Sequence, residues 1–238
     1  MGKIIIDFDL NKVKSAGEAL KVLRANVQFC GTDIHSIVVT SCLPDEGKST
    51  TSLGLSMALA QAGKKVLLVD ADLRKSVMLK KYTNAVNVFG FSEFLSGLAT
   101  IEQVKQNTQL GNLDIIFCGQ YPANPTELLS SSAFKAFIDE EKKNYDYIIV
   151  DTPPLGVVVD AAVVASVCDG AIMVLSEGKI KCGLASAVIK QLEKSGARII
   201  GTVLNKREKN NDGYGAAYSG IYGKKYSYYK YNYKYSEK

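Results

Sequence analysis

Hydrophobic residues fall along the chain in short continuous runs, separated by stretches with helical spacing. The runs are rich in β-branched residues and lack regular polar alternation, which is typical of strands buried on both faces of a parallel sheet. Strands that alternate with helices predict an α/β fold, with a mostly parallel central sheet and helices on both faces. The predicted strands are 35–41, 65–72, 113–119, 145–154, 170–178 and 197–205, and the predicted helices between them are 49–63, 126–143, 160–168 and 182–195.

A further helix is predicted before the first core strand. Its apolar residues form a single stripe at helical spacing, so we expect a helix at about 16–29 that docks on the domain. The stripe comprises Ala19, Leu20, Leu23 and Val27. The pattern at 76–110 is too weak to assign elements.

Composition and charge set the C-terminal segment apart. With 238 residues, 47% of them hydrophobic, the chain can form one sizeable domain. Residues 209–238 contain almost no aliphatic side chains and carry six lysines against two acidic residues, which is +4 of the formal net charge of +5. Such a segment is expected to be disordered when alone. We therefore predict a domain at 1–208 and a flexible tail at 209–238.

The location of the protein is predicted from what the sequence lacks. Five scattered cysteines without metal-ligand spacing indicate reduced thiols in a cytoplasmic protein. The N-terminal apolar run is too short for a secretory signal, and Ile6 stands where a myristoylation motif needs Ser or Thr. Since no apolar run reaches the length of a membrane span, any link to a membrane is expected to come through a partner.

A phosphate-binding loop is indicated between the first core strand and the next helix. Residues 41–51 read SCLPDEGKSTT, which matches the end of the pattern G-x-x-x-x-G-K-[ST] but has Cys42 in place of the first glycine. Gly47 would let the backbone approach a phosphate closely, and the helix N-terminus would direct N–H groups at it. In this pattern Lys48 reaches the β- and γ-phosphates of a nucleotide and Ser49 binds Mg²⁺.

Three aspartates follow predicted strands at the same edge of the sheet. Asp70 and Asp72 follow one buried strand, and Asp151 follows another. Ligands of open α/β sheets bind beyond the carboxyl ends of the strands. Carboxylates that converge there repel one another unless a cation lies among them. Although a single aspartate at a strand end can simply cap a helix, the combination of motifs predicts a nucleotide and cation site.

These motifs together resemble those of the bacterial tyrosine kinases. GKSTT at 47–51, VDADLR at 69–74 and YDYIIVDTPP at 145–154, with the tyrosine-rich tail, are similar to the separate cytoplasmic kinase of Gram-positive capsule or exopolysaccharide operons. The resemblance covers nearly the whole chain. It implies a P-loop NTPase-like fold and an ATP-dependent kinase that phosphorylates tyrosines, chiefly in its own tail and in trans, and regulates polysaccharide synthesis and export.

The resemblance also implies roles for individual residues. Asp70 is the expected acceptor of the tyrosine proton, although the division of roles between Asp70 and Asp72 stays open, and Arg74 would stabilise phosphate charge or brace its loop. The expected catalytic residues are Lys48, Asp70, Asp72 and Asp151. The expected Mg²⁺ ligands, direct or through water, are Ser49, Asp72 and Asp151. The expected ATP-binding residues are Asp45, Glu46, Gly47, Lys48, Ser49, Thr50 and Arg74.

Two departures from the family pattern carry expectations of their own. Glu18, Lys21 and Arg24 correspond to an E-x-x-R-x-x-R motif used in ring assembly, and their spacing is expected to place them on one helical face. Lys21 lacks the bidentate geometry of arginine, so weaker self-assembly is expected; an ordinary solvated helix face is the alternative. Asp45 stands where the family often has glycine, and its carboxylate would weaken nucleotide binding unless it points outward.

The tail offers a row of acceptor tyrosines. A flexible chain can enter the active site of a neighbour, and each phosphate adds about −1.5 to −2 charge. The hypothesis is that unmodified tails dock in neighbouring subunits and that phosphorylated tails are repelled, so that the ring falls apart; a merely solvating tail is the alternative. The expected autophosphorylation sites are Tyr214, Tyr218, Tyr222, Tyr226, Tyr228, Tyr229, Tyr231, Tyr233 and Tyr235.

The sequence also leads to predictions about binding partners and to two alternative functions. The resemblance implies a ring-like homo-oligomer, a membrane adaptor of the polysaccharide co-polymerase type that recruits the kinase to the inner face of the membrane, and a protein-tyrosine phosphatase. One rival is a ParA/MinD-like ATPase, whose loop usually carries an additional lysine where Leu43 stands. The other is a module whose basic aromatic tail binds single-stranded nucleic acid; the phosphate loop makes that a poor sole function, so no nucleic acid is expected.

Overall fold

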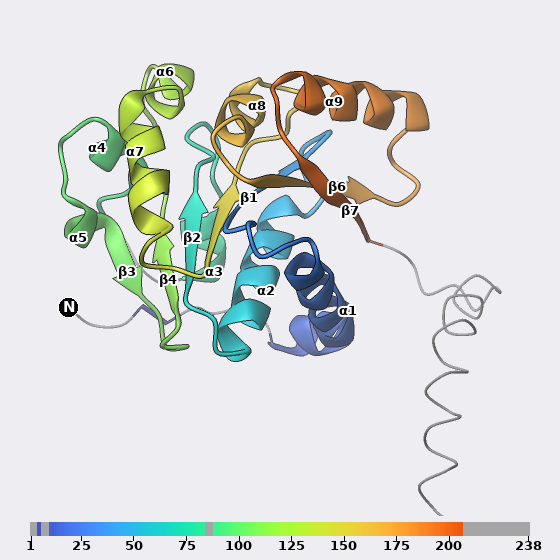
Figure 1. Ribbon diagram of the computed structural model, residues 1–238, viewed down its shortest axis with the longest axis horizontal. Helices are drawn as coiled ribbons and strands as arrows, with labels where there is room; N and C mark the ends of the chain where they lie inside the picture. Colours follow the sequence, from blue (N-terminus) through green and yellow to red (C-terminus); the bar gives the residue numbers. More distant parts are fainter. Residues whose placement is uncertain (1–3, 6–9, 84–87, 207–238) are drawn as a thin grey trace, which may run out of the picture. The chain divides into compact units, whose positions relative to one another are not determined.

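The fold is organised around one mixed, mostly parallel sheet. A computed structural model of the protein describes residues 4–5, 10–83 and 88–206, so the predicted tail and its tyrosines lie outside the described residues (Figure 1). The strand order is β3-β4-β2-β5-β1-β6-β7, and only the edge pair β3 and β4 is antiparallel. The strands are β1 (Ser36–Ser41), β2 (Val66–Asp70), β3 (Lys105–Asn107), β4 (Leu113–Ile116), β5 (Tyr147–Asp151), β6 (Gly170–Ser176) and β7 (Ile199–Asn205). The predicted fold class is confirmed.

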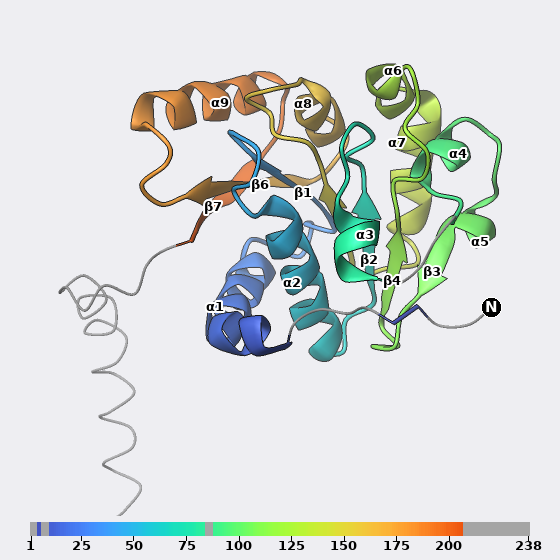
Figure 2. The ribbon, with the colours of Figure 1, turned by 180° about the vertical axis from the view of Figure 1, so that it is seen from behind.

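Helices cover both faces of this sheet. In Figure 1 α7 lies in front of the sheet, and the view from behind shows α1, α2 and α3 on the opposite face (Figure 2). The helices are α1 (Leu10–Phe29), α2 (Lys48–Gln61), α3 (Met78–Tyr82), α4 (Phe91–Leu95), α5 (Ile101–Val104), α6 (Pro125–Leu129), α7 (Ser132–Glu141), α8 (Asp160–Ala165) and α9 (Cys182–Lys194). Within the described residues, no helix combines the length and the apolar character needed to cross a membrane.

The observed elements refine the predicted ones in two places. The predicted helix at 126–143 is two helices, α6 and α7, because the Ser131 hydroxyl accepts a hydrogen bond from the Phe134 amide and so starts a new helix. The unassigned stretch at 76–110 contains the short elements α3, α4, α5 and β3. Elements of three to five residues are too short to show a clear period in the sequence.

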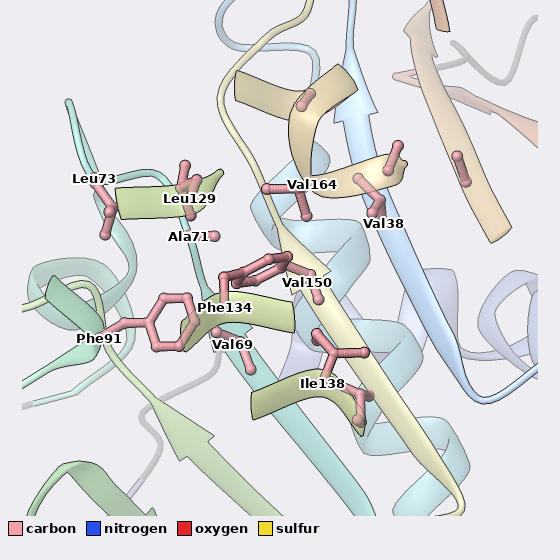
Figure 3. Close-up of a cluster of buried hydrophobic side chains, with 14 of the residues drawn as sticks. Val38, Val69, Ala71, Leu73, Phe91, Leu129, Phe134, Ile138, Val150 and Val164 are labelled. Atoms are coloured by element: carbon pink, nitrogen blue, oxygen red, sulfur yellow. The ribbon is translucent and has the colours of Figure 1, made fainter. Parts of the chain in front are cut away.

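Alternate side chains of the central strands pack into two separate cores. Val38, Val69 and Val150 point toward α7 and α8, where Phe134 lies between strands and helices (Figure 3). Their neighbours along the strands pack against α1, α2 and α3 on the other face. Because both faces are covered, the strands are apolar throughout.

Replacing Phe134 with Ala tests the first of these cores. Phe134 is fully buried, and its ring packs edge-on against Phe91 with the centroids 6.0 Å apart. We expect a loss of about 3–5 kcal/mol in the free energy of unfolding, from lost burial and the cavity left behind. Urea unfolding measures this value. Leu98, which is 75% exposed, is the control: its replacement by Ala should change stability by less than about 0.5 kcal/mol, and equal effects would contradict the packing argument.

Candidate active site

The loop between β1 and α2 wraps closely at Gly47. This residue adopts a left-handed backbone with φ of 93°, and a Cβ atom there would lie 2.0 Å from Nδ2 of Asn205. The same Asn205 amide donates a hydrogen bond to the Glu46 carbonyl at 2.9 Å. Both conformation and space therefore require glycine, and the end of β7 holds the loop in place.

Cys42, at the position of the missing first glycine, fits the loop for two reasons. Its backbone is not left-handed, so the conformation does not demand glycine. Its side chain is fully buried in the core that contains Val38 and Val150. Burial and the nearby Glu46 raise the pKa of the thiol to about 11, so it stays neutral at physiological pH. The departure from the strict phosphate-loop pattern is thus compatible with the loop geometry.

The Glu46 carboxylate turns into the protein, away from the place of a nucleotide. It is 2% exposed, and its two oxygens accept hydrogen bonds from the amides of Leu43 at 2.7 Å and Ser176 at 2.9 Å. The side chain therefore ties the loop to the end of β6. Because both carboxylate oxygens already accept hydrogen bonds, the contact of Glu46 with ATP stays a prediction for its backbone alone.

Asp70, Asp72 and Asp151 gather at the carboxyl ends of β2 and β5. Asp70 and Asp151 are register partners on these paired strands, and the Lys48 ammonium lies 3.4 Å from a carboxylate oxygen of Asp72. Burial, and then Asp151, raise the pKa of Asp70 to about 8, and burial also raises the pKa of Asp151. Burial lowers the pKa of Lys48, but Asp151 and Asp72 outweigh it, so the ammonium stays charged.

Hydroxyl groups orient these carboxylates, and two of them were missed by the sequence analysis. Ser52 donates to Asp151 at 3.0 Å, and Ser76 donates to Asp70. The predicted ligand Ser49 lowers the pKa of Asp151, although burial outweighs it. Ser52 could have been predicted as a site residue, because it lies about one helical turn after Ser49. No nearby sequence pattern indicated Ser76.

A cavity of about 470 Å³ opens beside the loop. Its lining includes the predicted phosphate-binding residues Gly47, Lys48, Ser49 and Thr50, together with Asp72. Further basic residues, Arg74, Lys75, Lys81 and Lys206, also line the cavity. Its apolar lining residues are Val77, Pro153, Pro154, Val157 and Val158. The Thr50 hydroxyl pairs with that of Tyr82 at 2.7 Å. A cavity with a basic, amide-rich wall fits a nucleotide polyphosphate.

The oxygen groups of this cavity fit Mg²⁺ bound together with a nucleotide. Among the residues that the structure describes, no group of three His, Cys, Asp or Glu side chains could hold a metal ion by itself. Mg²⁺ is commonly bound through one or two carboxylates, with phosphate and water oxygens completing the octahedron. Asp72 and Asp151, with the Ser49 hydroxyl, offer such a partial set of ligands. Within the described residues, the Lys48 ammonium interacts with all three carboxylates and Arg74 with Asp72, and a bound cation would neutralise the cluster further.

Arg74 lines the cavity, but its guanidinium is already hydrogen-bonded to residues of α6 and α8. Its Nε and Nη2 atoms donate to the two carboxylate oxygens of Asp160 at 2.6 and 3.0 Å, and Nη2 also donates to Thr126 at 2.8 Å. Of the two predicted roles, contact with phosphate charge and bracing of the loop, the geometry supports bracing. Asp160 was not predicted as a site residue, because a contact across 86 positions leaves no local pattern in the sequence.

The N-terminal helix corrects one expectation. Lys21 and Glu18 form an exposed ion pair at 2.7 Å, but Arg24 turns toward α2, with Nη1 3.5 Å from the Ala58 carbonyl. The expectation that all three share one face was wrong, because six residues advance an α-helix by one and two-thirds turns. Only Glu18 and Lys21 present their charges together.

Replacing Asp45 with Gly is expected to tighten nucleotide binding by about three- to tenfold. Asp45 is exposed beside the cavity and holds a left-handed backbone with φ of 61°, so glycine removes both strain and negative charge. Asp45→Asn is the matched control, because Asn tolerates this conformation and removes the charge alone. Titration with Mg-ADP measures the nucleotide affinity of both variants. Unchanged or weaker binding by the glycine variant would contradict the expected cost of Asp45.

Comparison with known proteins places this geometry among relatives. A family model described as AAA domain matches residues 36–198. The tyrosine-protein kinase CpsD of Streptococcus agalactiae is 40% identical over 221 residues, which is 93% of this chain and 96% of the relative. The kinase domain of the Escherichia coli tyrosine kinase ETK has a TM-score of 0.75 at 34% identity, covering 83% of this chain and 79% of its own.

A solved structure of the rival class is less similar. The septum site-determining protein MinD from Pyrococcus horikoshii, complexed with Mg-ADP, has a TM-score of 0.60 at 26% identity. The comparison covers 79% of this chain and 77% of MinD. Both classes share the fold, and the kinase exceeds MinD in identity and in structural similarity.

Proposed function

The chain belongs to the bacterial tyrosine kinases, and on that premise we propose that it uses Mg-ATP to phosphorylate tyrosines in the tail of another copy of itself. The observation that carries this proposal is the position of Asp70. A buried carboxylate with a pKa raised to about 8 lies beside Asp151, at the edge where Lys48 and the phosphate loop meet. In its ionised form this carboxylate can accept a proton next to a bound γ-phosphate, and a pKa near the working pH suits a general base.

The proposed reaction assigns each side chain one task. The phenol oxygen attacks the γ-phosphorus, the bond to the β–γ bridging oxygen breaks, and ADP leaves. Because a free phenol has a pKa of about 10, Asp70 takes its proton as the new bond forms. Lys48 stabilises charge on the transferred group. Mg²⁺, held by Ser49, Asp72 and Asp151, would supply further neutralisation of phosphate charge.

The apolar lining residues of the cavity suit an aromatic acceptor. Val157 and Val158 are wall residues, and Val157 is 58% exposed, so a tyrosine ring that packs there removes apolar surface from water. The tail places nine tyrosines among lysines and small residues. A segment of this composition can present several of them in turn to one site.

A mixing experiment tests transfer between chains. The catalyst is a full-length variant with all nine tail tyrosines changed to Phe, and the acceptor is the full-length Lys48→Met variant with an intact tail. With Mg-ATP, we expect phosphotyrosine on the acceptor tail, located by mass spectrometry. Each variant incubated alone with Mg-ATP is the control and should show little phosphotyrosine on its tail. Phosphate confined to 1–208, or hydrolysis of ATP with no phosphotyrosine after addition of a membrane fraction, would reject the proposal.

Assembly and partners are the wider part of the proposal. We propose a ring-like homo-oligomer that disassembles as tails become phosphorylated, recruited to the cytoplasmic face of the membrane by a polysaccharide co-polymerase-type adaptor. A protein-tyrosine phosphatase would reset the tails, and the cycle would regulate capsular or extracellular polysaccharide synthesis. Size-exclusion chromatography before and after Mg-ATP treatment checks the assembly step.

A further inference from the structure

Asp160 is a buried carboxylate outside the catalytic set. It is the first residue of α8, and its side chain is 0% exposed. Both of its oxygens accept hydrogen bonds from the Arg74 guanidinium, and the Thr126 hydroxyl adds a third at 2.8 Å. A bidentate pair of this kind fixes the plane of the guanidinium as well as its position.

The backbone of Arg74 connects this ion pair to the active site. One oxygen of Asp72 accepts hydrogen bonds from the amides of Arg74 at 3.4 Å and Lys75 at 3.0 Å. The other oxygen of Asp72 faces the Lys48 ammonium at 3.4 Å. The turn at 72–75 therefore sets the direction of the Asp72 carboxylate, and Arg74 anchors that turn to α8.

Stability alone does not account for a charged pair at this place. Burying a carboxylate is costly, and buried ion pairs can often be replaced by apolar side chains with a gain in stability. The ion pair fixes the orientation of Arg74, because its guanidinium can bind both oxygens of Asp160 in only one orientation. Groups that orient a metal-binding side chain, without touching the metal themselves, commonly change metal affinity or activity by about 10–100-fold when removed.

We propose that Asp160 is a positioning residue for phosphoryl transfer. Through Arg74 it holds the turn at 72–75, so that Asp72 keeps one oxygen toward Lys48 and the place of Mg²⁺. The kinetic part of this inference rests on the proposed function, whereas the part that concerns metal-dependent nucleotide binding does not.

The test compares Asp160→Asn with Asp169→Asn. The amide is the same size as the carboxylate but offers one acceptor oxygen in place of two, so the fork of Arg74 loses a partner. Asp169 is the matched control: it pairs with Lys142 at 2.6 Å and accepts from the Ser36 amide at the opposite ends of the strands. Both substitutions should lower the unfolding midpoint.

Only Asp160→Asn should change the function of the site. We expect its kcat to fall about tenfold or more with less change in the KM for ATP. In ADP titrations, the gain in affinity that Mg²⁺ gives over EDTA should shrink several-fold, whereas affinity in EDTA stays within about twofold. Asp160→Glu should restore part of the Mg²⁺ effect. If Asp160→Asn behaves like Asp169→Asn, the inference is rejected.

A second variant keeps the test decisive if Asp160→Asn fails to fold. Asp160→Asn combined with Arg74→Gln removes the ion pair without leaving a buried charge. A folded double variant with a normal Mg²⁺ effect on ADP affinity would overturn the inference, and a reduced effect would support it. Since ADP binding needs no kinase activity, failure of the proposed function leaves this measurement intact.

Discussion

Lys48→Met is expected to lower phosphotyrosine formation by at least about a hundredfold. Lys48 lies against Asp72 inside the cavity, with its side chain 14% exposed. In this largely water-excluded place its charge acts on phosphate oxygens with little screening. Methionine keeps the length of the side chain and removes the charge, so the loss reports on electrostatics. The rate of phosphate transfer from labelled ATP measures it.

The same substitution should also weaken the nucleotide-free fold. Asp70, Asp72 and Asp151 would lose the ammonium that interacts with all three, and buried carboxylates without a close cation are destabilising. We therefore expect a lower unfolding midpoint, partly recovered at mildly acidic pH when carboxylates become protonated. Lys81→Met is the control, because Lys81 is an exposed cavity residue. A Lys48→Met variant that retains more than about a tenth of wild-type transfer would contradict the role of Lys48.

Asp70→Asn should abolish most transfer while it makes the metal-free protein more stable. Asparagine cannot accept the phenolic proton, and loss of a general base commonly costs about 10²–10⁴-fold in rate. Yet Asp70 is 1% exposed and shares its strand edge with Asp151, and this crowding raises its pKa. Neutralising it removes repulsion from the fold, so the unfolding midpoint in EDTA should rise.

Asp114→Asn on the adjacent strand β4 is the matched control. Asp114 accepts hydrogen bonds from Asn107 at 2.7 Å and Tyr145 at 2.7 Å, so its neutralisation should neither raise the midpoint nor reduce transfer. Retained transfer in Asp70→Asn would exclude Asp70 as the proton acceptor. A midpoint that falls instead would show that its hydrogen bonds outweigh the repulsion. Rate and midpoint thus test two separate parts of the assignment.

The sequence by itself determined six of the seven strands and the main motif of the site. Buried strands are apolar throughout because both faces of the sheet are covered, so each of the six predicted strands could be recognised locally. The phosphate loop was equally local, since Gly47, Lys48 and Ser49 are consecutive residues between a strand and a helix. The aspartates at strand ends could be grouped because parallel strands end at one edge.

The tertiary structure decided which of these groups meet and which are already engaged. Asp70 is beside Asp151 only because β5 inserts between β1 and β2, an order that no local pattern encodes. Glu46 and Arg74 lie within the predicted motifs, but their partners are far along the chain. The Glu46 carboxylate accepts a hydrogen bond from the Ser176 amide, and Arg74 donates to Asp160. The period of the hydrophobic pattern shows on which side of its helix or strand a residue lies. The partner of a buried charge depends instead on how elements that are distant in the sequence pack together.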